Sequence, residues 1–287
     1  MITTIDDGFK QLRSNLEITD LQEEVVSTRQ KNVRAALEGD FTILDSFLAG
    51  SYRRSTMMAP LKTADIDVFI VLDPKYYTNK GQATLLQTLK TSLRKTYPKT
   101  PDIHPDGQAV TIEFSDFKVD VVPCFNRQGG GFLIPNQVTA SWIETDPKKH
   151  IEIWSAANKW HDGQLIPLIK MLKGWNISRK IFKSFHLEVV ALSVLSGVRI
   201  DSYHSGLRYV FDKAREKINF KLADPAGYND DVAAHVSTTE AINRIVAALE
   251  VAYITANDAE VLAARGNMKV AFERWSTLLD GYFPSYG

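Results

Sequence analysis

The segment from Asp65 to Leu72 combines two aspartates, Asp65 and Asp67, with a run of Ile, Val, Phe and Leu side chains. This run is typical of a β-strand, and Asp73-Pro74 ends it. Because strand side chains alternate between faces, both carboxylates project from the same side. Two such groups repel each other and are costly to desolvate, and a cation between them removes both problems. Hard carboxylate oxygens suit Mg²⁺, which commonly takes substrate phosphates as further ligands, so the pair indicates metal-assisted chemistry on a nucleotide.

The composition restricts the possible partners. The chain has 287 residues, with 34 basic and 34 acidic side chains. A protein that holds long nucleic acids non-specifically usually has a basic excess, so the balanced charge gives no support to that partner. The single cysteine, Cys124, excludes an intramolecular disulfide and a cysteine-rich zinc site. The N-terminus lacks the apolar core of a secretory signal, and the longest apolar stretch, 187–198, is too short to span a bilayer. We therefore expect a cytoplasmic protein that is not attached to a membrane.

The chain changes character near Asp146. Before it, helical patterns alternate with strand-like runs; after it, the strand signal fades and helical patterns follow one another. This predicts an α+β fold, with a mixed β-sheet, flanking helices and a long N-terminal helix in residues 1–160 and a helical domain in 161–287. The expected helices cover 20–37, 84–97, 147–160, 164–176, 184–199, 204–218, 232–256 and 258–280, and the expected strands cover 41–48, 65–72, 109–114 and 117–122, the last closed by Pro123.

A third carboxylate, Asp120, stands in the later strand-like run Lys118-Val119-Asp120-Val121-Val122, and Gly50-Ser51 precedes all three acids. This pattern resembles the polymerase β-like nucleotidyltransferase superfamily, and within it the cyclic GMP-AMP synthase/DncV-like group, the bacterial CD-NTases that make cyclic oligonucleotides in anti-phage (CBASS) signalling. The stretches 50–56 and 135–147 and the pair Asp224-Pro225 support the resemblance, which covers nearly the whole chain. It implies a polymerase β-like core and a helical domain, with the active site in the cleft between them.

The resemblance also implies a chemistry for these residues. In such enzymes a hydroxyl of one nucleotide attacks the α-phosphorus of a nucleoside triphosphate and releases pyrophosphate. Asp65, Asp67 and Asp120 would be the catalytic residues and would bind two Mg²⁺ ions, with Mn²⁺ as a substitute. Asp120 would also be the nearest proton acceptor. Gly50 and Ser51 would bind the β- and γ-phosphates through backbone N–H groups and the hydroxyl at a helix start.

Further nucleotide-binding candidates lie in the helical half. Lys173 resembles the triphosphate-binding lysine of related enzymes, with Lys170 as second choice, although a solvated helix face is the ordinary role of a lysine. Ser184 resembles a phosphate-contacting residue. Phe185 stands where relatives have Tyr and would stack on the donor base, or belong to the core. Weaker candidates for phosphate or a second nucleotide are Arg53, Arg54 and Thr56, which flank Gly50-Ser51 in the first half. Asp224 and Asn229 belong to a loop that the resemblance places near the nucleotide cleft.

The leading hypothesis is a template-independent, monomeric enzyme that makes a cyclic di- or trinucleotide from ATP, GTP or UTP, without an obligatory nucleic acid. A separate effector would read the product. One alternative is a nucleotidyltransferase acting on an RNA or tRNA 3′ end, which the balanced charge disfavours. Another is a nucleotide-binding module whose catalysis has decayed, against which the three carboxylates and Gly-Ser count. Base preference, ring size and linkage stay open.

Overall fold

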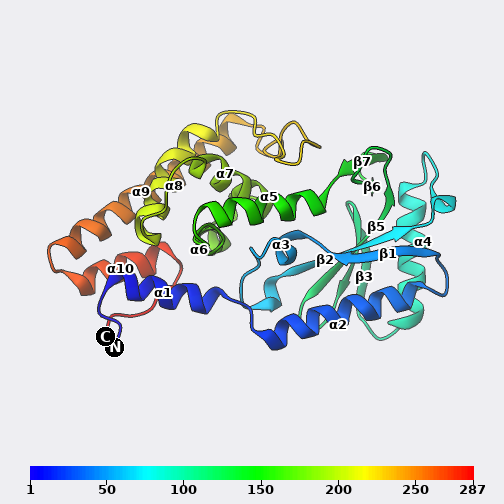
Figure 1. The fold of residues 1–287 in the computed structure, drawn as a ribbon, viewed down its shortest axis with the longest axis horizontal. Coiled ribbons are helices and arrows are strands. Elements are labelled where there is room, and N and C mark those ends of the chain that lie inside the picture. The colour runs from blue at the N-terminus through cyan, green and yellow to red at the C-terminus, as the bar shows by residue number, and fades with distance from the viewer. The chain divides into compact units, whose positions relative to one another are not determined.

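The computed structural model describes residues 1–287, with all side chains except that of Thr63. The chain forms two compact units (Figure 1). We call residues 18–152 the sheet unit, and residues 1–17 together with 153–287 the helical unit. No described helix combines the length and the apolar character that a bilayer crossing requires.

The sheet unit is built on a mixed sheet whose main strand order is β1-β2-β5-β4-β3. Strands β2 and β5 are parallel neighbours, and the other pairs are antiparallel. A short ribbon of β6 and β7 continues from the end of β5. The strands are β1 (Ile43–Leu48), β2 (Asp65–Leu72), β3 (Asp102–Asp106), β4 (Ala109–Glu113), β5 (Lys118–Asn126), β6 (Phe132–Asn136) and β7 (Ser141–Thr145).

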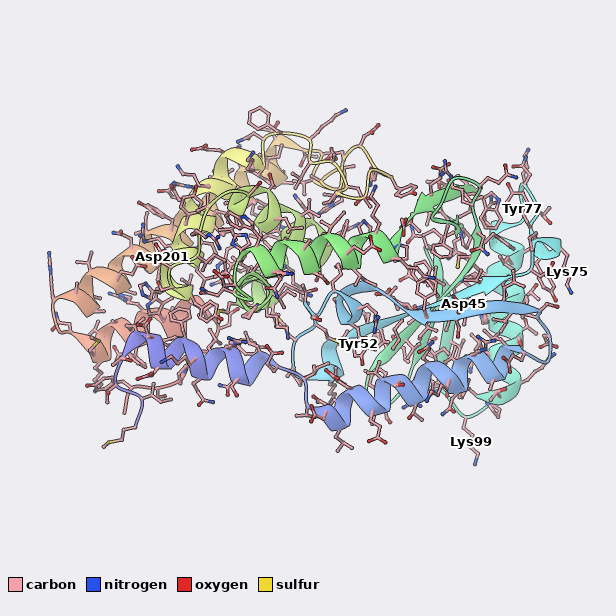
Figure 2. All side chains as sticks on the ribbon, in the orientation of Figure 1. Asp45, Tyr52, Lys75, Tyr77, Lys99 and Asp201 are labelled. Carbon is pink, nitrogen blue, oxygen red and sulfur yellow. The ribbon has the colours of Figure 1, made fainter. Side chains whose placement is uncertain are left out.

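Two helices, α2 (Asp20–Leu37) and α4 (Gln82–Thr96), cover one face of this sheet. Alternate residues of β2, namely Ile66, Val68 and Ile70, form the core with them, because strand side chains alternate between faces. Tyr52, labelled in Figure 2, is one of the partly buried side chains that pack against this core. The opposite face holds a smaller apolar cluster around Phe69 and Val122. The short helix α3 (Gly50–Arg53) and the 3₁₀ turns Leu61–Thr63 and Pro74–Tyr76 complete the unit.

The helical unit contains most of the remaining helices, and α1 (Ile5–Leu16) belongs to it. Phe9 of α1 has its ring 4.9 Å from those of Trp275 and Phe283. Sequence reasoning missed this helix. The other helices are α5 (Pro147–Trp160), in which the boundary between the units falls, α6 (Leu165–Arg179), α7 (Ser184–Leu195), α8 (Tyr203–Lys217), α9 (Thr239–Ala264) and α10 (Met268–Leu278).

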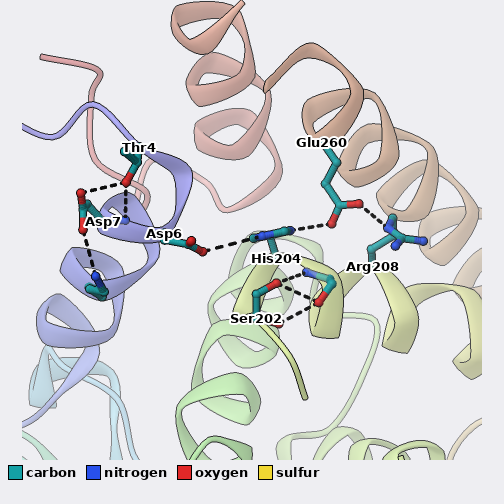
Figure 3. A network of polar contacts seen from close by, with 9 residues as sticks. Thr4, Asp6, Asp7, Ser202, His204, Arg208 and Glu260 are labelled. Atoms are coloured by element: carbon teal, nitrogen blue, oxygen red, sulfur yellow. Dashed lines mark hydrogen bonds and ion pairs between the residues drawn. The ribbon is translucent and has the colours of Figure 1, made fainter. Parts of the chain in front are cut away.

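A polar network joins α1, α8 and α9 within the helical unit (Figure 3). The Glu260 carboxylate lies 2.8 Å from His204 Nδ1 and 2.6 Å from Arg208 Nε. Asp6 lies 3.7 Å from the other ring nitrogen of His204. Burial acts to raise the pKa of Glu260, but the hydrogen bonds from His204 and Arg208 outweigh it and hold the pKa below its usual value. This network and the packing of Phe9 explain why the first 17 residues belong to the helical unit.

The observed units differ from the predicted domains, 1–160 and 161–287, at both ends of the sheet unit. The first 17 residues lie with the C-terminal helices, and the second boundary falls at residue 152, inside α5. Several predicted element ends are also wrong, among them the end of the helix predicted at 184–199, since α7 ends at Leu195, and the start of the helix predicted at 232–256, since α9 begins at Thr239. β5 continues through Pro123 to Asn126, because β4 pairs with β5 only as far as Val121 and the proline needs no ladder bond on that side. The predicted break at 256–258 lies inside α9, which ends just before Gly266.

Candidate active site

The pairing of β2 with β5 brings the three predicted carboxylates onto one face of the sheet. Asp67 lies directly opposite Asp120, and Asp65 lies opposite Lys118. Cross-strand partners share a face, as do residues two apart on a strand. Adjacent strands are about 4.8 Å apart, so carboxylates at these positions are close enough to share a cation. Two segments separated by more than forty residues thus contribute to one acidic site.

Two of the carboxylates, Asp65 and Asp120, are energetically unfavourable as charged groups where they lie. Burial raises the pKa of Asp120, and the negative charge of Asp65 raises it further, while a hydrogen bond from Thr111 opposes the rise. Desolvation is also the main influence that raises the pKa of Asp65, and Lys118 opposes it. The pKa shifts therefore have the direction expected for acids that need a positive partner.

The donor set fits a hard divalent cation, because it consists of carboxylate oxygens on one face. The described side chains, however, form no ready-made group of three His, Cys, Asp or Glu ligands. The Asp120 side chain is bonded to Thr111, whose Oγ1 lies 2.6 Å from Asp120 Oδ1. Mutual repulsion of the carboxylates gives a physical reason why they lie apart in the absence of a cation. The role of Asp65, Asp67 and Asp120 as metal ligands stays a prediction.

Gly50 lies against the Asp67 carboxylate. A Cβ atom at this glycine would lie 1.6 Å from Asp67 Oδ2, and its φ of +59° is one that glycine adopts without strain. The Ala49 N–H donates to the Asp67 carbonyl at 2.9 Å, which fixes the loop to β2. The Ser51 carbonyl accepts from the N–H groups of Thr56 and Met57 and closes the turn after α3. Gly50 and Ser51 are therefore next to the acidic site, and their phosphate contacts stay predictions.

A cavity of about 260 Å³ opens on the same face. Asp67 and Asp120 line it together with Asp106, Gly107 and Gln108 of the turn between β3 and β4. Its apolar wall is formed by Phe69, Ala109, Val122 and Ile134. Sequence reasoning missed this turn, although Asp-Gly between two strands is a strong hairpin signal.

Lys170, Lys173, Ser184 and Phe185 lie in the helical unit, whereas the carboxylates, Gly50 and Ser51 lie in the sheet unit. Lys173 Nζ lies 3.4 Å from Oε1 of Glu188, whose side chain is fully buried. Lys170, also buried, lies 2.5 Å from Glu17. Neither lysine is on a solvated helix face, so that alternative is wrong for both. A buried carboxylate orients Lys173, whose contact with phosphate stays a prediction.

Ser184 and Phe185 open α7. Ser184 is exposed, and the Phe185 ring is half-buried and stacks on Trp154 at 5.8 Å with an interplanar angle of 20°. Phe185 thus has an aromatic neighbour within its own unit, and its stacking on a base stays a prediction.

The weaker candidates divide into structural and exposed residues. Asp224 stabilises its own loop, since its carboxylate accepts from the N–H groups of Ala226 and Tyr228, and its N–H donates to the Asn229 carbonyl. Arg54 and Thr56 are buried, whereas Arg53 is exposed.

Comparison with known proteins decides the family. Residues 3–158 match the Second Messenger Oligonucleotide or Dinucleotide Synthetase domain. The chain belongs to this family. A cyclic AMP-AMP-AMP synthase from Acinetobacter sp. is 26% identical over 83% of this chain and 75% of its own length.

Solved structures agree on the fold. The E. coli CdnC structure with ATP is 20% identical, with a TM-score of 0.77 over 98% of this chain and 99% of that one. The Vibrio cholerae DncV cyclic AMP-GMP synthase is 13% identical, with a TM-score of 0.68 over 98% and 87%. The predicted family and the α+β polymerase β-like fold are confirmed.

The alternative of an RNA-modifying enzyme has weaker support. A CCA-adding enzyme from Pyrobaculum aerophilum is 26% identical, but the match covers 69% of this chain and 48% of that enzyme. The match to the cyclic AMP-AMP-AMP synthase covers more of this chain and more of the relative than the match to the CCA-adding enzyme does. It therefore favours the synthesis of cyclic oligonucleotides over RNA 3′-end transfer.

Proposed function

We propose that this protein is a template-independent nucleotidyltransferase that joins nucleoside triphosphates into a cyclic di- or trinucleotide. The observation that carries the proposal is the register of β2 and β5, which places Asp67 opposite Asp120 with Asp65 on the same face. Membership of the synthetase family supports it. ATP, GTP and UTP are the substrate candidates, and the product serves as a signal for a separate effector in bacterial anti-phage defence. The protein acts as a cytoplasmic monomer.

The reaction joins a ribose hydroxyl of one nucleotide to the α-phosphorus of another. The new P–O bond replaces the bond to the bridging oxygen, and pyrophosphate leaves with the electron pair. Asp120 is the nearest group to accept the hydroxyl proton. Asp65, Asp67 and Asp120 would hold two Mg²⁺ ions, or Mn²⁺ in their place, and these ions would supply positive charge to the attacking and leaving oxygens.

The other residues bind and orient the nucleotides. Gly50 lets the backbone approach the Asp67 carboxylate closely, so that its loop lies next to the acidic site and its N–H groups bind the β- and γ-phosphates. Ser51 supplies its hydroxyl to the same phosphates. Lys173, oriented by Glu188, offsets the charge of the leaving pyrophosphate. Ser184 contacts phosphate, and Phe185 stacks on the donor base.

The test is product formation by the purified protein with Mg²⁺ and the four labelled ribonucleoside triphosphates. A phosphatase-resistant product is expected, whose mass gives the bases and ring size. The double variant Asp65→Asn/Asp67→Asn should make none while keeping the wild-type circular dichroism spectrum, because only two carboxylate charges are removed. Product from this variant would reject the assigned site.

The same assay distinguishes the second candidate, which the CCA-adding match raises. Labelled triphosphates are supplied with and without tRNA. Label on the tRNA, with no product from triphosphates alone, would replace the proposed function by RNA 3′-end transfer.

A further inference from the structure

Asp120 has a hydroxyl neighbour that no motif pointed to. Thr111 of β4 lies directly opposite it in the antiparallel register of β4 and β5. The Thr111 hydroxyl donates to Asp120 Oδ1 at 2.6 Å. Thr111 is 6% exposed, so little water competes for this bond.

The bond has the properties of a fixed support. Hydrogen bonds from a hydroxyl to an ionised carboxylate are about 2.5–2.7 Å long and roughly twice as strong as neutral ones. A threonine side chain is stiff at χ1 because it is branched at Cβ, so its hydroxyl has few alternative positions. Thr111 thus orients the carboxylate without needing a charge of its own.

The charges around Asp120 show why an orienting bond matters. Asp65 and Asp67 on β2 share its face, and their charges repel an Asp120 carboxylate that turns toward them. Lys118, two residues before Asp120, is bound to Glu113 of β4 at 2.7 Å. The hydroxyl of Thr111 therefore supplies a contact that commits Oδ1 to β4 and leaves Oδ2 as the oxygen for a cation.

We propose that Thr111 is a positioning residue, whose hydroxyl holds Asp120 in the orientation that binds the divalent cation. This inference rests on the proposed function, because Asp120 is the third carboxylate of the proposed site. It adds a residue on a third strand, β4, to a site otherwise formed by β2, β5 and the loop at Gly50. It also predicts a defect in cation binding that can be measured without turnover.

The experiment compares three single variants. Thr111→Val removes the hydroxyl at nearly constant size and keeps a β-branched side chain. Thr111→Ser keeps the hydroxyl. Ile112→Val is the matched packing control, since it changes the same strand on the opposite, core-facing side. Should Thr111→Val unfold, Thr111→Ala removes the hydroxyl without placing a methyl group against the carboxylate.

Two readouts are taken. The first is Mn²⁺ binding by electron paramagnetic resonance, with the protein alone and with a non-hydrolysable ATP analogue. The second is kcat and KM for product formation. For Thr111→Val we expect the Mn²⁺ dissociation constant to rise and kcat to fall by about 10- to 100-fold, the usual effect of removing an outer support of a metal ligand. KM for the nucleotide should change far less. Thr111→Ser and Ile112→Val should stay close to wild type.

Two results would overturn the inference. One is Mn²⁺ binding by Thr111→Val at wild-type affinity. The other is an equal loss in Ile112→Val, which would assign the effect to packing of β4. If the wild type binds Mn²⁺ but forms no phosphodiester product, the proposed function fails, and the Mn²⁺ measurements still decide the role of Thr111.

Discussion

The two faces of the sheet differ although the same strands build both. On one face of β2, Ile66, Val68 and Ile70 are fully buried beneath α2 and α4. On the other, Asp67 is half-buried and Asp65 exposed, beside Asp120 of β5. A shift of register by one residue would exchange the two sets. The apolar face thus fixes the register on which the acidic face depends.

The faces also contribute to stability with opposite sign. Burying an Ile or Val side chain contributes about 1.5–3 kcal/mol. Carboxylates with raised pKa values instead lower the stability of the folded state at neutral pH. The following changes test this contrast.

The largest effect on stability is expected from Ile66→Ala, on the apolar face. Removing a fully buried isoleucine side chain should lower the free energy of unfolding by about 2–5 kcal/mol, measured by urea denaturation. The kcat of the protein that remains folded should stay within a few-fold of wild type. A fall in kcat of the folded protein by more than a few-fold would show that the two faces do not act separately.

A smaller change in stability, with a specific loss of activity, is expected from Gly50→Ala. The added Cβ meets Asp67 Oδ2, and the left-handed backbone costs about 1–3 kcal/mol for alanine. Since the carboxylate must move, kcat should fall by about 10- to 100-fold, as for other disturbed metal ligands. Gly39→Ala is the control, because nothing lies within 4 Å of its Cβ position. Similar kcat values for both variants would contradict the contact with Asp67.

The smallest effect concerns pH, measured by urea denaturation in a chelator. The folded state holds the Asp120 proton more tightly than the unfolded state, because its pKa is raised above 3.8. The stability that the protonated Asp120 gives the folded state is therefore lost as the pH rises from the pKa of the unfolded state through that of the folded state. Asp120→Asn should remove it, so the variant gains stability relative to wild type as the pH rises. If the difference in free energy of unfolding between Asp120→Asn and wild type is the same at pH 4 and pH 7, burial of the Asp120 carboxylate does not lower stability.

Local patterns predicted the elements whose signals are local. β2 spans Asp65–Leu72 as expected, since its apolar run ends at Asp-Pro. α2 spans Asp20–Leu37 as expected, and a capping box of Thr19 and Gln22 begins it. By contrast, β3 contains Pro105 and polar residues, so its strand character comes from pairing with β4.

The residues of the candidate site likewise divide into those that the sequence could predict and those that it could not. Asp65, Asp67 and Asp120 could be found from sequence, because acids within apolar runs are conspicuous. Thr111 could not, since it is an ordinary strand residue until the register places it beside Asp120. The pairing of Lys173 with Glu188 depends on the packing of α6 and α7 in the same way.

The assignment of α1 to the helical unit has a consequence for biosynthesis. Domains generally fold as units while the ribosome adds residues. Residues 18–152 can complete their own core once they have been synthesised, but the apolar side of α1, with Phe9, Leu12 and Leu16, stays uncovered until α6, α8 and α10 on the far side of that segment have been made. The sheet unit can therefore fold before the helical unit, and the apolar face of α1 is exposed to solvent in the meantime.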